Sequence, residues 1–275
     1  MKILAGLSER RGTFEAALVD LWGVMHNGLR AYEDALACLD EMRRAGIAVF
    51  LLSNAPRRAQ DVAHRIAALG IAEDRYDALY SSGEETWRFL RTAPLGTRAF
   101  PIMSEKDRSL IVDTPIELDE VTEADFILAS GIENEDARVA DYAEKLASAR
   151  MRALPMLCAN PDLIVHVGAR EEICAGAIAA AYESEGGQVH YIGKPHPEIY
   201  RKIFAERRVA PERVLAIGDS FRTDIAGGRN AGCQTLLVAG GIHRRDLLPL
   251  QNATLEDAVA AYPARPDFVI PFLRW

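Results

Sequence analysis

The sequence predicts an α/β protein with a doubly wound, Rossmann-like parallel sheet and an inserted α/β cap. Short apolar runs alternate with amphipathic helical patterns near both ends of the 275-residue chain, and this alternation is typical of a parallel sheet covered by helices on both faces. Between about residues 84 and 187 the helical patterns become uneven, and acidic loops separate the apolar runs. We therefore expect a core of residues 1–83 and 188–275, with residues 84–187 as the cap.

The first part of the expected core alternates strand and helix twice. The stretch "AALVDLW" indicates a buried strand, and "YEDALACLDEMRRAG" places Leu36, Leu39 and Met42 on one helical face before Gly46 ends the helix. The run "IAVFLLS" is apolar throughout, as parallel strands are when both of their faces are covered. A second amphipathic helix is expected over residues 57–69.

The same alternation returns near the end of the chain. We expect strands in "VHYIG", "VLAIGD" and "CQTLLVAG", with helices over about residues 197–207 and 223–231 between them. In the inserted segment, "ADFILAS" and "PMLCAN" are also typical of strands. Short connections between these elements favour one sheet with helices on both sides.

The charge and the short apolar runs of the chain argue against nucleic acids and membranes as partners. The net charge is −8 and the pI is near 5.4, so a chain without a dense basic stripe is repelled by the phosphates of DNA or RNA. The longest apolar run, residues 47–52, is far too short to cross a bilayer, and charges in "MKILAGLSERRG" interrupt any signal-peptide core. We expect neither a nucleic-acid nor a membrane partner.

The cysteines indicate the compartment. Their positions are scattered, without a CxxC pair or a nearby histidine cluster, and they are Cys38, Cys158, Cys174 and Cys233. This spacing is typical of buried thiols in a reducing compartment rather than of disulfides or a zinc site. We therefore expect a cytoplasmic location.

Four expected strands end in polar residues, and ligands bind beyond the carboxyl ends of parallel strands. These residues are Asp20, the pair Ser53 and Asn54, Lys194 in "GKPHPEIY", and Asp219 with Asp224 in "GDSFRTDIAGG". Each of them alone is compatible with a helix cap or an ordinary turn. Their occurrence at successive strand ends instead indicates a site for a phosphate group and a metal ion.

With these motifs, the sequence resembles the haloacid dehalogenase superfamily, specifically its NagD-like (class IIA) phosphatases with a large inserted cap. "DLWGV" matches the first motif in part, "LLSN" the second, "GKP" with its helix the third, and "GDSFRTDIAGG" the fourth. In the insert, "CANPD" resembles the Asn-Pro-Asp element of that branch's caps. The resemblance implies magnesium-dependent hydrolysis of a small phosphate monoester, such as a sugar phosphate.

The resemblance also implies a role for each matching residue. Asp20 is the expected nucleophile, which forms an aspartyl-phosphate. The expected Mg²⁺ ligands are Asp20, the backbone carbonyl of Trp22, Asp219 and Asp224. Ser53, the backbone amide of Asn54 and Lys194 are expected to hold the phosphoryl group. In the cap, Asn160, Asp162, His166 and Arg170 are candidates for substrate contact.

Position 22 departs from the family pattern. The phosphatases of this family carry there a second Asp, which protonates the leaving group and later activates water, whereas Trp22 cannot do either because indole is a donor only. Three outcomes stay open: slow hydrolysis of esters with good leaving groups, proton transfer by His26 or a cap acid, or a protein that binds a phosphorylated ligand and Mg²⁺ without efficient turnover. A dehalogenase is disfavoured, because its mechanism dispenses with magnesium and Asp219 and Asp224 suit a cation.

The insert does not identify the substrate or the assembly. Sugar phosphates, pyridoxal phosphate, glycerol phosphates and nucleotides all fit a small phosphorylated metabolite as the partner. Caps of the NagD-like branch often mediate dimers, so the resemblance allows a homodimer.

Overall fold

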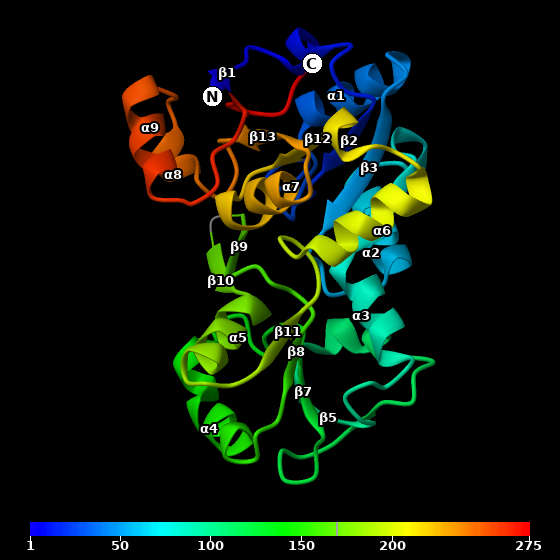
Figure 1. Ribbon diagram of the computed structural model, residues 1–275, viewed down its shortest axis with the longest axis vertical. Coiled ribbons are helices and arrows are strands. Elements are labelled where there is room, and N and C mark those ends of the chain that lie inside the picture. Colours follow the sequence, from blue (N-terminus) through cyan, green and yellow to red (C-terminus); the bar gives the residue numbers. More distant parts are fainter. Residues whose placement is uncertain (169) are drawn as a thin grey trace.

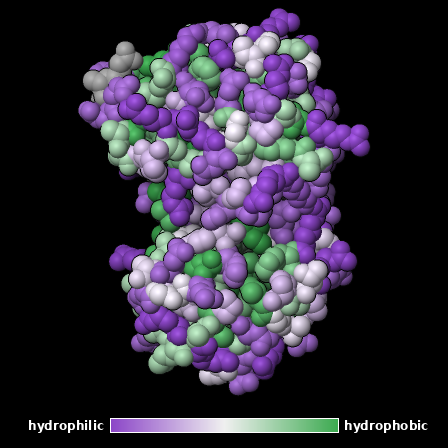
Figure 2. All heavy atoms as spheres, in the orientation of Figure 1, coloured by the Kyte–Doolittle hydropathy of each residue, from purple (hydrophilic) through white to green (hydrophobic). Residues whose placement is uncertain are grey.

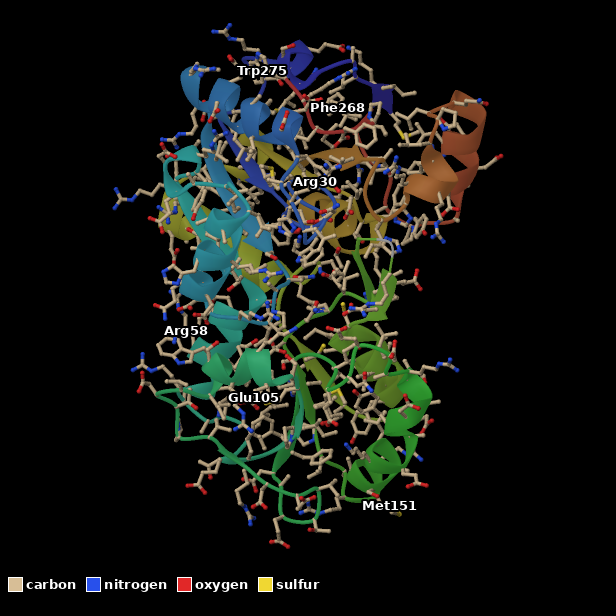
Figure 3. All side chains as sticks on the ribbon, turned by 180° about the vertical axis from the view of Figure 1, so that it is seen from behind. Arg30, Arg58, Glu105, Met151, Phe268 and Trp275 are labelled. Atoms are coloured by element: carbon tan, nitrogen blue, oxygen red, sulfur yellow. The ribbon has the colours of Figure 1, made fainter. Side chains whose placement is uncertain are left out.

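The computed structural model describes residues 1–168 and 170–275, and for residues 252–254 it describes the backbone only. Figure 1 shows two lobes, each built on a parallel sheet with helices packed against it. In Figure 3, Trp275 lies toward the far end of one lobe and Met151 toward the far end of the other. The expected α/β class, with a second sheet inserted into the first, is confirmed.

The core sheet has the strand order β1-β14-β13-β12-β2-β3-β4, and its neighbouring strands are parallel. Its strands are β1 (Lys2–Ile3), β2 (Ala16–Val19), β3 (Ala48–Ser53), β4 (Ala78–Ser81), β12 (Val214–Gly218), β13 (Gln234–Val238) and β14 (Phe268–Ile270). From β2 the chain proceeds outward to β3 and β4, and from β12 it proceeds outward the other way to β13 and β14. The border of β2 and β12 is therefore the switch point at which ligands bind in such sheets.

Helices cover both faces of the core sheet because side chains alternate between the two faces along each strand. Val19, Leu51 and Ile217 pack with α1 and α2 on one face. Leu18 and Leu52 pack with α6 on the other. The core helices are α1 (Glu33–Arg44), α2 (Ala59–Ala68), α6 (Pro197–Arg207), α7 (Ala226–Asn230), α8 (Arg244–Leu247) and α9 (Asn252–Ala260). This arrangement confirms the doubly wound core.

The cap sheet has the order β11-β8-β7-β5-β6, again with parallel neighbours. Its strands are β5 (Arg98–Ile102), β6 (Glu117–Leu118), β7 (Phe126–Ala129), β8 (Met156–Cys158) and β11 (Val189–Tyr191), and its helices are α4 (Ala143–Met151) and α5 (Ala175–Ser184). Helix α3 (Ser82–Leu90) leads from β4 into the cap. An antiparallel hairpin of β9 (Ile164–Val167) and β10 (Arg170–Ile173) lies at the border with the core.

Several short helical turns connect these elements. They are η1 (Leu7–Arg10), η2 (Glu73–Arg75), η3 (Glu105–Leu110), η4 (Val139–Tyr142), η5 (Pro211–Arg213) and the π turn η6 (Phe221–Ile225). Each helix within residues 1–168 and 170–275 is too short or too polar to cross a membrane. The cysteines are buried and free, as the sequence predicts.

One expected strand belongs to the other sheet. We expect "VHYIG" among the core strands, but Val189–Tyr191 form β11, which pairs with β8 in the cap sheet. The physical reason is that β11 is an edge strand with an exposed His190, whereas a central core strand is buried on both faces. The chain crosses to the core at Gly193, where φ is +119°. The division at residues 84 and 187 otherwise stays a prediction, with β11 on the cap side.

Candidate active site

The ends of β2 and β12 bring two predicted residues together. Val19 is paired with Ile217 in the core sheet, so Asp20 and Asp219, which follow these strands closely, emerge side by side. The backbone N–H of Asp20 donates to the carbonyl of Ile217 at 2.9 Å. The register of the core sheet therefore fixes the position of Asp20 without the help of a ligand.

Asp20, Asp219 and Asp224 form a buried carboxylate cluster. Each offers an oxygen that lies within 4.8 Å of the others. The ammonium of Lys194 lies 2.5 Å from Oδ1 of Asp20 and 2.7 Å from Oδ1 of Asp224. The cluster thus holds three acidic side chains against one lysine.

Burial and charge both act on the titration of this cluster. Burial raises the pKa of Asp219 well above its usual value, and repulsion by Asp20 and Asp224 raises it further. The pKa of Asp20 is also raised by burial, although Lys194 opposes the rise. Burial alone lowers the pKa of Lys194, but attraction to the carboxylates outweighs burial and leaves this pKa raised. The site is therefore short of positive charge.

A divalent cation fits this donor set. The ligand atoms are carboxylate oxygens, which Mg²⁺ prefers, and three acids with one lysine leave an excess of negative charge in a buried place. Burial, with repulsion by Asp20 and Asp224 in addition, raises the pKa of Asp219 in this place. Asp20, Asp219 and Asp224 are therefore the residues that would hold the ion. The further ligand expected from the carbonyl of Trp22 stays a prediction.

The π turn η6 aims Asp224 into the cluster. We expect a helix from about residue 223, but the backbone first forms a π turn over Phe221–Ile225 before α7 begins. Such turns are frequent at functional sites. The N–H of Ser220 donates to Oδ2 of Asp224 at 3.1 Å, and a Cβ on Gly218 would lie 2.0 Å from the carboxyl carbon of Asp224.

Asp219 is held by a loop that sequence reasoning does not identify. The N–H of Ile242 donates to Oδ2 of Asp219 at 2.7 Å. A Cβ on Gly23 or Gly241 would lie 1.8 or 2.0 Å from the same oxygen, so the loops after β2 and β13 can enclose it only because both residues are glycine. The "AGG" after β13 is the signal that was available in the sequence.

The second motif provides a hydroxyl and a bridging amide. Ser53 is buried at the end of β3, and its hydroxyl accepts from the N–H of Ala55 at 3.1 Å. The side chain of Asn54 accepts from the N–H of Lys194 at 2.8 Å and donates to the carbonyl of Lys194 at 3.0 Å. It also donates to Oδ1 of Asp162 at 3.0 Å. Asn54 therefore connects the second motif, the third motif and the cap.

The cap candidates divide into two groups. Asn160 is buried, and its Oδ1 accepts from the N–H of Asp162 at 3.1 Å, which shapes the turn that presents Asp162 to the core. Arg170 is not brought to the carboxylate cluster, since its guanidinium pairs with Glu172 at 2.6 Å and Glu135 at 2.7 Å. His166 contacts Glu171 within the β9–β10 hairpin at 3.2 Å. Their substrate contacts stay predictions.

Trp22 and His26 shape the loop after β2. Their rings meet edge to face with centroids 4.9 Å apart, and a Cβ on Gly28 would lie 2.4 Å from the indole. Nδ1 of His26 accepts from the N–H of Gly28 at 3.0 Å. Burial lowers the pKa of His26 to about 4, with a smaller contribution from Arg65. At neutral pH His26 is therefore a neutral, engaged imidazole, which argues against it as the proton carrier.

Contacts between the two lobes close the cap over the site. Arg222 donates to the carbonyl of Pro161 at 2.9 Å, and Arg57 pairs with the buried Asp107 at 3.2 Å. The N–H of Gly168 in the hairpin donates to the carbonyl of Asn27 at 3.3 Å. Figure 2 shows the narrow waist where the lobes meet. Motif searching in the sequence does not find these contacts.

A second set of contacts lies on the outer side of this junction. Arg58, labelled there in Figure 3, stacks on the ring of Trp87 at 3.5 Å and pairs with Glu84 at 2.7 Å. Because α3 carries both Glu84 and Trp87, the loop after the second motif is attached to the helix that leads into the cap.

The closed site leaves little free volume. A cavity of about 10 Å³, the size of one water molecule, is bordered by Asp20, Lys194, Asp224 and Tyr200. Tyr200, which is buried on α6, is a further site neighbour that the sequence does not single out. A cavity of about 720 Å³ lies elsewhere, beside α8, and its lining contains none of the predicted site residues. The cavity beside Asp20 is therefore much smaller than a phosphate ester.

Comparison with known proteins identifies the family. Models described as haloacid dehalogenase-like hydrolase match residues 17–117 and 112–232, and a HAD-hydrolase-like model matches residues 191–275. A crystal structure titled as a hydrolase of the haloacid dehalogenase-like family from Brucella suis 1330 is 32% identical, covers 98% of this chain and 100% of its own, and superposes with a TM-score of 0.86. The chain belongs to the haloacid dehalogenase-like hydrolase family.

Within this family the chain is NagD-like, as its motifs predict. It is 29% identical to chronophin of Mus musculus over 97% of this chain and 91% of that protein. It is 26% identical to the ribonucleotide monophosphatase NagD of Escherichia coli K12 over 94% of this chain and 96% of that protein. The crystal structure of E. coli NagD is 25% identical, covers 94% of this chain and 97% of its own, and has a TM-score of 0.68. These similarities extend over the core and the cap together.

Proposed function

We propose that this NagD-like phosphatase hydrolyses small phosphate monoesters with the help of Mg²⁺, through an aspartyl-phosphate at Asp20. The observation that carries the proposal is the meeting of Asp20, Asp219 and Asp224 with Lys194 at the switch point of the core sheet. When bound, Mg²⁺ neutralises phosphoryl oxygens and aligns them with the nucleophile.

The residues of the chain have distinct roles in this proposal. Oδ1 of Asp20 is held by Lys194 at 2.5 Å, which favours its charged, nucleophilic form. Ser53 and the backbone N–H of Asn54 bind oxygens of the transferring phosphoryl group, and Lys194 stabilises the charge that develops there. The closed cap excludes water while the P–O bond of the ester breaks.

Substrate class, location and assembly extend the proposal. Relatives named as a ribonucleotide monophosphatase and a dihydroxyacetone phosphatase support a small phosphorylated metabolite, such as a sugar phosphate, as the substrate. The acidic charge of the chain opposes nucleic acid as a partner. A cytoplasmic location and a homodimer through the cap stay predictions.

The experiment is magnesium-dependent release of nitrophenol from p-nitrophenyl phosphate, whose leaving group departs without a proton. We expect release by the parent, none by Asp20→Asn, and unchanged release by the matched control Asp34→Asn, which changes an exposed acid on α1. After quenching with acid, the parent protein should carry a covalent phosphoryl label, and Asp20→Asn should carry none. Nitrophenol release by the parent that does not rise above the background of Asp20→Asn, at high enzyme concentration, contradicts the proposal and favours a protein that binds its phosphorylated ligand without turnover.

A further inference from the structure

The loop after β2 contains no group that can carry the proton of the leaving alcohol. Trp22 does not titrate in the useful range, and His26 is buried, neutral and engaged through Nδ1 with Gly28. Alkyl esters nevertheless need such a proton, because an alkoxide leaves poorly without one. The acid must therefore come from elsewhere in the closed site.

The cap places one carboxyl against the side chain of Asn54, the residue whose backbone N–H is assigned to the phosphoryl group. Asn160 turns the backbone so that Asp162 faces the core, and Arg222 fixes the neighbouring carbonyl of Pro161. Oδ1 of Asp162 then accepts from Nδ2 of Asn54, the same nitrogen that donates to the carbonyl of Lys194. Because Oδ1 is engaged as an acceptor, a proton on this carboxyl resides on Oδ2.

The surroundings of Asp162 favour the protonated form of its carboxyl. Burial raises the pKa of Asp162, and the negative charge of Asp224 raises it further, whereas Lys194 and the hydrogen bonds from Asn54 and Thr223 oppose the rise. The titratable or charged groups around it are Asp20, Asp224, Lys194 and Arg222 from the core and Cys158 and Cys174 from the cap. Asp162 stays partly exposed, so it can exchange protons with water.

We propose that Asp162, delivered by cap closure and oriented by Asn54, is the general acid and base that replaces the carboxyl missing at position 22. This inference rests on the proposed function. In the first step Asp20 forms a bond to phosphorus, the ester P–O bond breaks, and the proton of Asp162 passes to the leaving oxygen, which departs as an alcohol. In the second step the Asp162 carboxylate takes a proton from water as that water attacks phosphorus. The bond between Asp20 and phosphorus breaks, and Asp162 is again protonated.

The variant Asp162→Asn tests this role with little change in shape. Its side-chain oxygen can still accept from Asn54, so this contact between cap and core is kept while the charge and the transferable proton of the carboxyl are lost. The matched control is Asp136→Asn, which alters an exposed acid of the cap. Pre-steady-state formation of the aspartyl-phosphate is measured with p-nitrophenyl phosphate and with an alkyl phosphate such as glycerol phosphate.

We expect Asp162→Asn to slow phosphorylation by the alkyl ester by about 10² to 10⁴-fold, the usual contribution of general acid catalysis. Phosphorylation by the nitrophenyl ester should change by less than about threefold, because nitrophenolate leaves without a proton. Its steady-state turnover should still fall, since hydrolysis of the aspartyl-phosphate needs the base. A pronounced burst of nitrophenol is therefore expected in the variant.

The dependence of kcat/KM on pH distinguishes proton transfer by Asp162 from a purely structural contact, because a structural contact does not change this dependence. Because the acid form of Asp162 is required, kcat/KM of the parent for the alkyl ester should fall as pH rises through the pKa of Asp162. This falling limb should be absent for nitrophenyl phosphate and in Asp162→Asn. Adding Trp22→Asp to Asp162→Asn should restore alkyl-ester turnover at least tenfold.

Two results overturn the inference in different ways. Equal slowing of phosphorylation by both esters in Asp162→Asn, with no recovery on adding Trp22→Asp, identifies Asp162 as a cap contact alone and leaves the proposed function intact. If nitrophenol release does not depend on Asp20, the proposed function fails and this inference fails with it. Slower phosphorylation by the alkyl ester alone, with the parent and Asp136→Asn alike, supports the inference.

Discussion

The core wall and the cap wall of the site are built differently. On the core wall, Asp20 and Asp219 follow adjacent strands whose hydrogen-bonded register fixes them, and Lys194 neutralises part of their charge. On the cap wall, Asp162 stands on a loop and meets the core through hydrogen bonds from Asn54 and Thr223. The groups proposed for the core wall are therefore positioned by one sheet, whereas the acid proposed for the cap wall is positioned by contacts between the two lobes.

The largest expected effect lies on the core wall. Asp219→Asn should lower Mg²⁺ affinity and reduce turnover by about 10²-fold or more, because a bound metal contributes several kcal/mol to such reactions. Without Mg²⁺ the variant should melt at a higher temperature than the parent, since a carboxylate whose pKa is raised by burial and by Asp20 and Asp224 is lost. Calorimetric titration and thermal melts check both expectations.

Asp34→Asn is the matched control for Asp219→Asn, because it removes an exposed carboxylate from α1. It should change neither Mg²⁺ affinity nor the melting temperature by a measurable amount. Equal Mg²⁺ affinity in Asp219→Asn and the parent would contradict the assignment of Asp219 as a metal ligand.

A carboxyl introduced at position 22 lies on the core wall, so it should be able to protonate the leaving group without relying on contacts from the cap. We expect Trp22→Asp to raise turnover of alkyl phosphates by about tenfold and that of nitrophenyl phosphate less, within the usual factor for general acid catalysis. The gain is reduced by the lost contacts of the indole with His26 and Gly28. Steady-state kinetics with both esters is the measurement. A folded variant no faster on alkyl esters than the parent shows either that another residue already transfers the proton or that Trp22 holds a geometry that the new carboxyl cannot use. A parent that is already fast on alkyl esters selects the first explanation.

His26, in the loop after β2, should make the free energy of unfolding depend on pH. The pKa of His26 is about 4 in the folded protein, against a usual value of 6.5, because burial disfavours its charge. The unfolded chain binds the proton first as pH falls below 6.5, so this stability is complete above that value and is lost toward pH 4. One pKa unit corresponds to about 1.4 kcal/mol, which gives a loss of about 3 kcal/mol.

Denaturant midpoints at pH 7 and pH 4.5 check this expectation. The difference between the two midpoints should be smaller in His26→Gln than in the parent, and His64→Gln, which changes an exposed histidine on α2, should match the parent. A parent and a His26→Gln variant with the same dependence on pH would show that the imidazole is not buried in solution.

The smallest effect is expected at the junction of the walls. Arg222→Met removes the donor to Pro161 but keeps much of the side-chain stem, and a single partly exposed hydrogen bond contributes about 1 kcal/mol. We expect kcat/KM for alkyl phosphates to fall about fivefold in the parent background, with little change when Trp22→Asp is present. Arg229→Met, which breaks an exposed pair with Asp267, is the control. The same fall in both backgrounds would show that closure acts on the core wall as well.

The sequence by itself determined the core wall. Asp20, Ser53, Asn54 and Asp219 lie at or directly after the ends of apolar runs, and in a parallel sheet these ends meet at one edge. The alternation of runs and helical patterns also determined the doubly wound class, because the periodicity of apolar residues is a local property of the chain. Even the departure at Trp22 is visible without coordinates.

Only the tertiary structure decided how the cap completes the site. That β11 joins the cap sheet, that Ile242 holds Asp219, and that Asn54 links Lys194 to Asp162 are facts of pairing between distant segments. No local pattern specifies them, because each depends on which surfaces pack once the strands are paired. The π turn that aims Asp224 likewise departs from the helical periodicity that the sequence predicts. Local sequence patterns thus predict which sheet edge gathers the candidate site residues, whereas long-range packing sets the residue that the cap presents to that edge.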